Sequence, residues 1–169
     1  MPQGRSAVAG EEVSCLDKAL QLLAQRSHFE AELRRKLLRR DYPQTEVEQI
    51  LAVLRRDGVI DDESVAAEFV ALRRRRRGEG SARIRQELLR RGVDEDLAQR
   101  AAAETSDDDE LRRARDLAAA RSGRGAEEAS IGRFLARKGY STRVILLVLE
   151  ELRRSDDESA PPAVDAGSR

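Results

Sequence analysis

Apolar residues recur every three or four positions along most of this chain, which is the spacing of amphipathic α-helices. In residues 15–25, for example, Ala19, Leu20 and Leu23 fall on one helical face. No segment shows the sustained alternation of apolar and polar residues that is typical of a half-buried strand. The pattern therefore predicts an all-α protein without a sheet.

Two capping-box motifs predict where the second and third helices begin. Ser27 and Glu30 have the spacing at which a serine and a glutamate satisfy each other's free backbone amides, and Thr45 and Glu48 repeat that spacing. The second helix is expected to stop before Tyr42-Pro43, because a residue that precedes proline avoids the helical region.

Six further helices are expected after Gly58, which suits the C-terminal cap of the third helix. The polar residues expected to begin five of them are Asp61 or Asp62, Ser81, Asp94, Ser106 and Ser141. The remaining helix follows a loop at 122–125 and stops at Gly139. The residues expected to face inward are Val65, Phe69 and Leu72 in the fourth helix, and Val144, Leu147, Val148 and Leu152 in the ninth.

A gapless repeat organises these helices. Leu37, Leu88 and Leu135 are equivalent at offsets of 51 and 47 residues. After one further residue, each is followed by two basic residues, a turn residue and one large apolar residue. The turn residues are Asp41, Gly92 and Gly139, and the apolar residues are Tyr42, Val93 and Tyr140. Because aspartate tolerates a left-handed turn less easily than glycine, the first turn is expected to differ in detail.

The repeat predicts three tandem three-helix units that stack into an elongated, curved array. The expected division is a flexible N-terminus at 1–13, repeats at 14–58, 59–105 and 106–154, and a disordered acidic tail at 155–169. Such an array exposes a long surface, which favours a binding protein over an enzyme.

Composition agrees with thin helix-on-helix packing. Charged residues make up 38% of the 169 residues, above the roughly 25% of an average domain, and only three Phe, two Tyr and no Trp supply aromatic core. The single cysteine, Cys15, excludes an internal disulfide and fits a reducing compartment. No apolar stretch is long enough to span a bilayer, and no signal-peptide core is evident. The chain is expected to be a cytoplasmic monomer without a membrane contact.

Positive charge is concentrated in one stretch of an otherwise neutral chain. Between Ala71 and Arg91, nine arginines stand against Glu79 and Glu87, a local net charge of +7 in a chain whose total is zero. The candidate binding residues are Arg73, Arg74, Arg75, Arg76, Arg77, Arg83, Arg85, Arg90 and Arg91. Such a field favours a phosphate backbone or an acidic protein surface as partner.

Each of these features also has a purely structural interpretation. The arginines at 73–77 suit a solvated helix end, and Arg90 and Arg91 suit helix termination, because equivalent basic residues end the same helix in every repeat. His28 has no second ligand nearby in the sequence. The pair Asp61-Asp62 is explained by capping. No catalytic, metal-binding or cofactor-binding motif is present, so neither an enzyme nor a cofactor is expected.

Residues 16–154 resemble the RecX family, the bacterial regulators of the RecA recombinase. The most specific match is the segment GSARIRQELLRRGV at 80–93, and SHFEAELRRKL at 27–37 and DGVIDD at 57–62 also match, whereas 134–140 fits more loosely. The resemblance implies three tandem three-helix repeats, binding to the RecA–DNA filament, and modulation, mostly inhibition, of strand exchange. It also implies a role in DNA repair, recombination and the SOS response.

Two other classes stay open. The chain could be a stand-alone DNA-binding protein, with single- or double-stranded DNA held by helix-turn-helix-like pairs, although its neutral total charge and few aromatic residues are unfavourable. It could also be a structural adaptor for another acidic partner.

Overall fold

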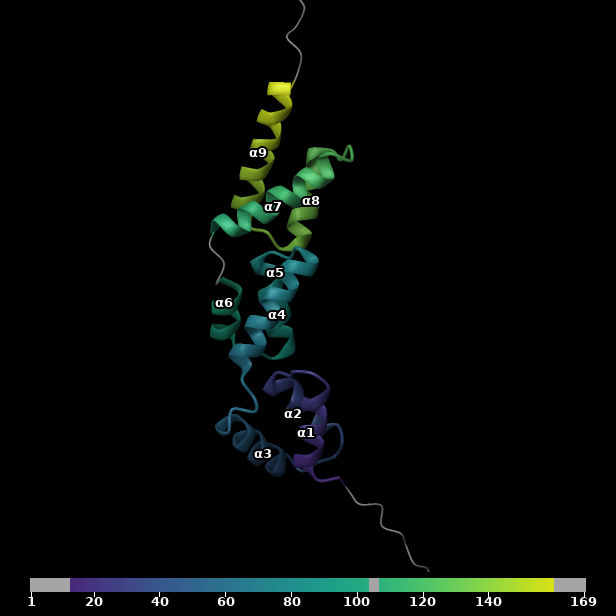
Figure 1. Cartoon of the computed structure of the whole chain (residues 1–169), viewed down its shortest axis with the longest axis vertical. Coiled ribbons are helices and arrows are strands. Elements are labelled where there is room, and N and C mark those ends of the chain that lie inside the picture. Colours follow the sequence, from purple (N-terminus) through teal and green to yellow (C-terminus); the bar gives the residue numbers. More distant parts are fainter. Residues whose placement is uncertain (1–12, 104–106, 160–169) are drawn as a thin grey trace, which may run out of the picture. The chain divides into compact units, whose positions relative to one another are not determined.

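The protein is entirely helical in the residues that the structure describes, 13–103 and 107–159 of a computed structural model. Those residues contain nine α-helices and no strand (Figure 1). The helices are α1 (Cys15–Gln25), α2 (Glu30–Leu38), α3 (Gln44–Arg56), α4 (Asp62–Arg77), α5 (Ser81–Arg91), α6 (Glu95–Ala103), α7 (Asp107–Ser122), α8 (Glu128–Lys138) and α9 (Thr142–Ser159). The predicted fold class is therefore confirmed as all-α.

The contacts divide the chain into two compact units. Within the described residues, unit 1 comprises 13–65 together with 91–93, and unit 2 comprises 66–90, 94–103 and 107–159. The elongated, curved arrangement of three repeats stays a prediction, as do the proposed repeat boundaries.

Unit 1 is built on α1, α2 and α3, which pack against one another around an apolar core. Each helix contributes residues at helical spacing, and burying these side chains is the main force that holds the three short helices together. The buried core residues are Cys15, Ala19, Leu22, Leu33, Leu37, Val47, Leu51, Leu54 and Ile60.

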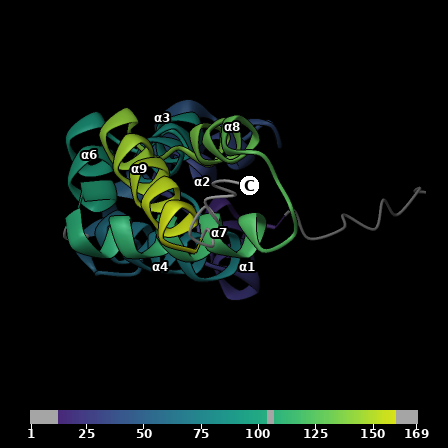
Figure 2. The ribbon, with the colours of Figure 1, turned by 90° about the horizontal axis from the view of Figure 1, so that it is seen from above.

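The C-terminal part of unit 2 is a second bundle, in which α7, α8 and α9 pack pairwise. Figure 2 shows α9 lying across α7. Small side chains on α7 allow this close approach, since Ala114 and Ala118 are fully buried. The buried core residues are Ala114, Ala118, Ile131, Leu135, Tyr140, Val144 and Val148.

The turns after the repeated helices share one backbone conformation. Gly92 and Gly139 have φ angles of 91° and 88°, in the left-handed region, as their place after a helix predicted. Asp41 also lies in this region, with a φ of 64°, because aspartate is one of the few residues other than glycine that enter it at modest cost. Helix α2 nevertheless ends at Leu38, two positions earlier in the repeat than α5 and α8, so the first turn differs in detail, as predicted.

The predicted capping boxes do not form. Helix α2 begins at Glu30 and α3 at Gln44, and neither has a side-chain cap on its own first turn. Instead, Asp62 accepts a hydrogen bond of 2.8 Å from the backbone N–H of Glu30. In unit 2, Glu110 accepts one of 2.9 Å from the backbone N–H of Ser81. Helices α2 and α5 are therefore each capped by an acidic residue about thirty positions further along the chain.

The other caps behave as local signals predicted. Asp61 accepts from the backbone N–H groups of Glu63 and Ser64, Asp94 caps α6, and Ser141 caps α9. Ser106, which was expected to begin α7, lies outside the described residues.

Two predicted inward faces need correction. On α4 the buried residues are Ala66 and Val70, whereas Leu72 is 41% exposed, because an arginine, Arg73, takes the next inward position. On α9 Leu147 is 38% exposed, and Ile145 and Leu149 pack against the core instead.

Helix α9 also extends to Ser159, so residues 155–159 of the predicted disordered tail are helical. No helix-breaking residue occurs there before Pro161, which explains the extension. Residues 160–169, like residues 1–12 of the predicted flexible N-terminus, lie outside the described part.

Candidate functional site

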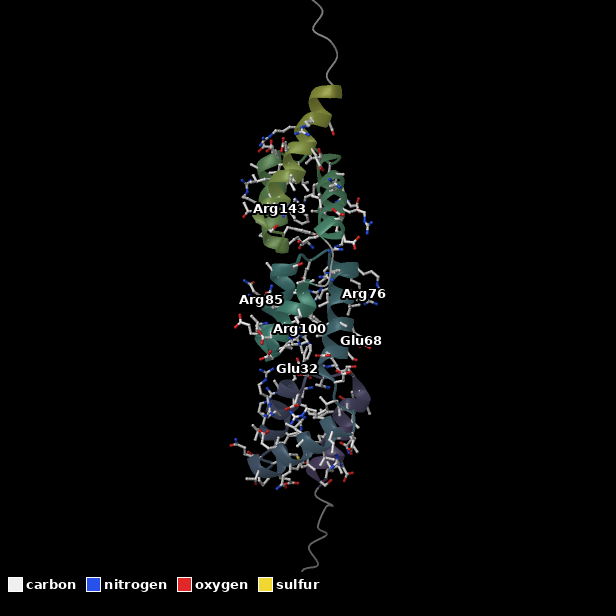
Figure 3. All side chains as sticks on the ribbon, turned by 90° about the vertical axis from the view of Figure 1, so that its left-hand side faces the viewer. Glu32, Glu68, Arg76, Arg85, Arg100 and Arg143 are labelled. Carbon is white, nitrogen blue, oxygen red and sulfur yellow. The ribbon has the colours of Figure 1, made fainter. Side chains whose placement is uncertain are left out.

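The arginine run at 73–77 forms the last turns of α4, and its residues have different surroundings. Arg73 and Arg74 are half-buried, whereas Arg75, Arg76 and Arg77 are exposed. Arg76 points outward from the helix (Figure 3). Five consecutive residues cover every side of a helix, so some of them must face the packed side. Among the described residues, no ion pair is found for the three exposed arginines.

Arg73 is neutralised inside unit 2. Its guanidinium lies 3.1 Å from Glu79 and 3.2 Å from Glu87, and it also lies over the ring of Phe69, 4.9 Å from the ring centre. Arg74 donates to the carbonyl oxygen of Ala102 at 2.7 Å. These two arginines hold the end of α4 in place, and Arg73, whose charge is balanced, contributes little positive charge to the surface.

The four remaining candidate arginines are each paired with a carboxylate. Arg83 lies 3.3 Å from Glu79, Arg85 lies 2.5 Å from Glu95, Arg90 lies 2.6 Å from Glu87, and Arg91 lies 3.3 Å from Glu32 within unit 1. Several of these pairs are exposed to solvent, where an ion pair contributes at most about 1 kcal/mol and breaks readily. The local charge of +7 is therefore partly balanced.

A cleft of about 480 Å³ lies beside the exposed end of the arginine run, and we call it the basic cleft. Its lining comes from the end of α4, the first turn of α5 and the end of α8, all in unit 2. The lining residues are Arg76, Arg77, Glu79, Arg83, Phe134, Arg137 and Lys138. Three of the predicted arginines therefore meet in one place.

The sequence reasoning missed three of the charged residues that line the basic cleft, namely Glu79, Arg137 and Lys138. The repeat contained a signal for the last two, because they align with Arg90 and Arg91. That equivalence favours the interpretation that they end a helix, and it gives no sign that they lie near the arginine run. Glu79 had been counted only as a partial offset to the positive charge.

His28 is buried, at 1% exposure, and is held by two neighbours. Its Nδ1 lies 2.8 Å from the carbonyl oxygen of Arg26, and its Nε2 lies 2.6 Å from the Lys36 ammonium. Since a carbonyl only accepts, Nδ1 carries the proton and Nε2 accepts from Lys36. Burial lowers the pKa of His28. Among the described residues, no group of three His, Cys, Asp or Glu side chains is arranged to hold a metal ion.

These features define an all-α protein made of small helical bundles, with a cationic surface at the end of one helix. None of its described helices is both long enough and apolar enough to cross a membrane.

The family follows from comparison with known proteins. The model of the first three-helix domain of RecX matches residues 15–54, and that of the second three-helix domain matches residues 61–101. The regulatory protein RecX of Escherichia coli (strain K12 / DH10B) is 36% identical over 140 residues, which cover 74% of this chain and 83% of the relative. The protein of that name from Escherichia coli O157:H7 (strain EC4115 / EHEC) gives the same values. The chain belongs to the RecX family of regulatory proteins.

Solved structures agree with this assignment. The crystal structure of RecX from Lactobacillus salivarius is similar with a TM-score of 0.76 at 22% identity, over 83% of this chain and 95% of that one. A crystal structure of a regulatory protein RecX has a TM-score of 0.72 at 27% identity, over 80% of this chain and 70% of the other. The first of these likenesses supports the fold alone.

Proposed function

We propose that this chain regulates the RecA recombinase by binding the RecA–DNA filament, and that it mostly inhibits strand exchange and filament-dependent ATP hydrolysis. Membership in the RecX family carries the proposal. The exposed arginines Arg75, Arg76 and Arg77 support it, because they present adjacent positive charges at one helix end. The protein acts by binding and not as an enzyme, in the cytoplasm and as a monomer, in DNA repair, recombination and the SOS response.

The nine candidate arginines are expected to contribute unequally to filament binding. An arginine that already pairs with a carboxylate must give up that pair before it can bind a new anion, so its net contribution is reduced. Arg75, Arg76 and Arg77 have no such pair among the described residues. We therefore assign them the largest share of the attraction to filament phosphates or to acidic RecA segments, an attraction that salt should weaken.

The predicted stacking of three repeats suggests how binding would become inhibition. An elongated, curved array could lie in the groove of the filament and span neighbouring RecA subunits. Occupying that groove would block entry of a second duplex and favour filament disassembly.

The direct test is a recombinase assay. DNA-dependent ATP hydrolysis and strand exchange by RecA are measured with and without the chain at stoichiometric ratios, and we expect both to fall. Unchanged rates would reject the proposal. A parallel measurement of binding to naked DNA addresses the alternative of a stand-alone DNA-binding protein. Tight, salt-dependent binding without RecA, combined with unchanged RecA activity, would favour that alternative.

A further inference from the structure

The basic cleft holds more positive charge than the fold requires. Five cationic side chains and one carboxylate line it, which gives a net charge of +4 around about 480 Å³. Arg76, Arg77 and Arg137 are exposed there, and no carboxylate pairs with them among the described residues. Like charges held this close repel one another, so an anion in the cleft would relieve the repulsion.

Helix C-termini normally disfavour anions, but four carbonyl oxygens at the ends of α4 and α8 already accept hydrogen bonds. Lys138 donates to the carbonyl of Arg77, and Arg83 donates to that of Arg137 at 2.8 Å. The carbonyls of Lys138 and Gly139 accept from backbone N–H groups of residues 80 and 82, at 2.9 Å and 3.2 Å. Donors therefore cover the negative end of α8 and the last carbonyl of α4, which weakens the repulsion of an anion.

The walls of the basic cleft are fixed by direct backbone packing. A Cβ atom at Gly80 would lie 2.5 Å from the carbonyl oxygen of Gly139, and one at Gly139 would lie 2.4 Å from the Cβ of Arg83. Only glycine permits this approach at either position. A cleft with walls held this way needs little ordering when a ligand binds, and such preorganisation favours affinity.

One residue that lines the basic cleft, Glu79, has an unused acceptor. Glu79 is only 3% exposed, and Arg73 and Arg83 both pair with its Oε1. Its Oε2 is buried and has no hydrogen-bond partner among the described residues. A buried carboxylate oxygen without a partner is costly, and a hydroxyl or amino group of a ligand would satisfy it.

We propose that the basic cleft binds a nucleoside triphosphate, with the phosphate chain on the arginines and Lys138 and a sugar hydroxyl or base amino group on Glu79. The cleft lies within the range of about 300–1,000 Å³ usual for small-molecule sites. Its cations converge on one space, which suits phosphates that are joined together. In a nucleic-acid strand the phosphates are spread along the chain, and a free inorganic triphosphate offers no donor matched to Glu79.

The test is calorimetric titration of the full chain with ATP at low ionic strength, without RecA or DNA, so that its outcome is separate from that of the proposed filament binding. We expect saturable one-to-one binding. The variant Arg76→Gln/Arg137→Gln removes two exposed cleft cations and should weaken binding about tenfold or more, because each lost cation removes a charge-assisted contact to the phosphates.

Arg124→Gln/Arg153→Gln is the matched control, because it removes the same charge from exposed residues outside the cleft lining, and Arg153 pairs with Glu128 at the opposite end of α8 from the cleft. It should leave ATP affinity within about twofold of the unchanged chain, since these side chains do not reach the cleft and water weakens the attraction between separated charges. Circular dichroism spectra would verify that both variants fold. No ATP binding, or equal weakening by the two variants, would overturn the proposal.

Two further probes test the identity of the ligand. Inorganic triphosphate should bind more weakly than ATP. In the Glu79→Gln variant the difference between these two affinities should be smaller, because the negative charge is removed. Equal binding of the two to the unchanged chain would contradict the role of Glu79. If a short oligothymidylate competes for the cleft more tightly than ATP, the occupant is a nucleic-acid strand and the proposal is wrong.

Discussion

His28 in unit 1 and Glu79 in unit 2 occupy equivalent positions, 51 residues apart, two residues before the second helix of their repeats. Both are buried polar residues with cationic neighbours, Lys36 beside His28 and two arginines beside Glu79. Both ring nitrogens of His28 have partners. Glu79 binds two arginines through one oxygen and leaves the other without a partner among the described residues.

The same offset relates Leu22 to Arg73. Leu22 is an ordinary core residue of unit 1, whereas Arg73 fills the corresponding place in unit 2 and depends on Glu79 and Glu87 for its charge balance. Equivalent positions of the repeat can therefore hold either an apolar core residue or a charged residue in an ion pair. In unit 1 a leucine at this position completes the core. In unit 2 an arginine at the same position supports a cationic surface.

Gly139→Ala is expected to have the largest effect on stability. The new Cβ meets Arg83 and the residue has a φ of 88°, so strain and overpacking together should cost about 3 kcal/mol of unfolding free energy. Gly125→Ala is the control in the same unit, because its φ is 76° but no atom lies within 4 Å of the added Cβ. It should cost about 1 kcal/mol. Urea unfolding followed by circular dichroism measures both, and equal losses would show that the backbone contact is unimportant.

Glu79→Leu should destabilise unit 2 by about 2 kcal/mol, because it leaves Arg73 half-buried with only part of its charge balanced. The side chain of Arg73 is 15% exposed and keeps Glu87 at 3.2 Å, so the cost stays below that of a fully isolated charge. Adding Arg73→Leu, which copies Leu22 of unit 1, should recover most of the loss. A double variant less stable than Glu79→Leu alone would show that the two repeats do not share this position.

The stability of unit 1 should depend on pH through His28. Burial lowers the pKa of His28 in the folded state, so the unfolded chain takes up the proton first as pH falls. The contribution is therefore complete above the ordinary pKa of about 6.5 and is lost as pH falls below it, by at most about 1.4 kcal/mol per pH unit. His28→Gln should show a smaller loss of unfolding free energy between pH 7.5 and 5.5, on the order of 1 kcal/mol less. Identical slopes would mean that His28 gains its proton without a stability cost.

Asp41→Gly is expected to have the smallest effect. Its φ of 64° is one that glycine adopts without strain, so the substitution should stabilise unit 1 by about 0.5 kcal/mol once the greater freedom of unfolded glycine is included. Thermal unfolding compares the variant with the unchanged chain. A clear loss of stability would show that the aspartate side chain, and not the turn geometry, determines this position.

Local signals predicted most of the fold. Helical spacing gave the helices, and short-range preferences placed Asp94, Ser141 and the left-handed glycines, because those interactions lie within a few residues of one another. The features that were not predicted are contacts between residues far apart in the sequence. Asp62 caps α2 from 32 residues away, which no local pattern encodes.

The candidate site was only partly predictable for the same reason. Charge counting found the arginines but could not distinguish Arg73, which the packing neutralises, from Arg76, which faces outward. The basic cleft joins residues 76 and 138, and the end of α8 reaches the arginine run only through tertiary packing.

We propose that the exposed arginines 75–77 are the main attachment to the filament. Fluorescence anisotropy of the labelled chain, titrated with RecA filaments formed on single-stranded DNA, measures that attachment directly. Replacing Arg75, Arg76 and Arg77 with serine should weaken binding at least about tenfold, since each lost charge contact to a phosphate or carboxylate contributes on the order of 1 kcal/mol or more. The same replacement at Arg112, Arg124 and Arg133, three exposed arginines of unit 2 outside the candidate set, should leave filament binding nearly unchanged. Undiminished binding of the first variant would contradict the account.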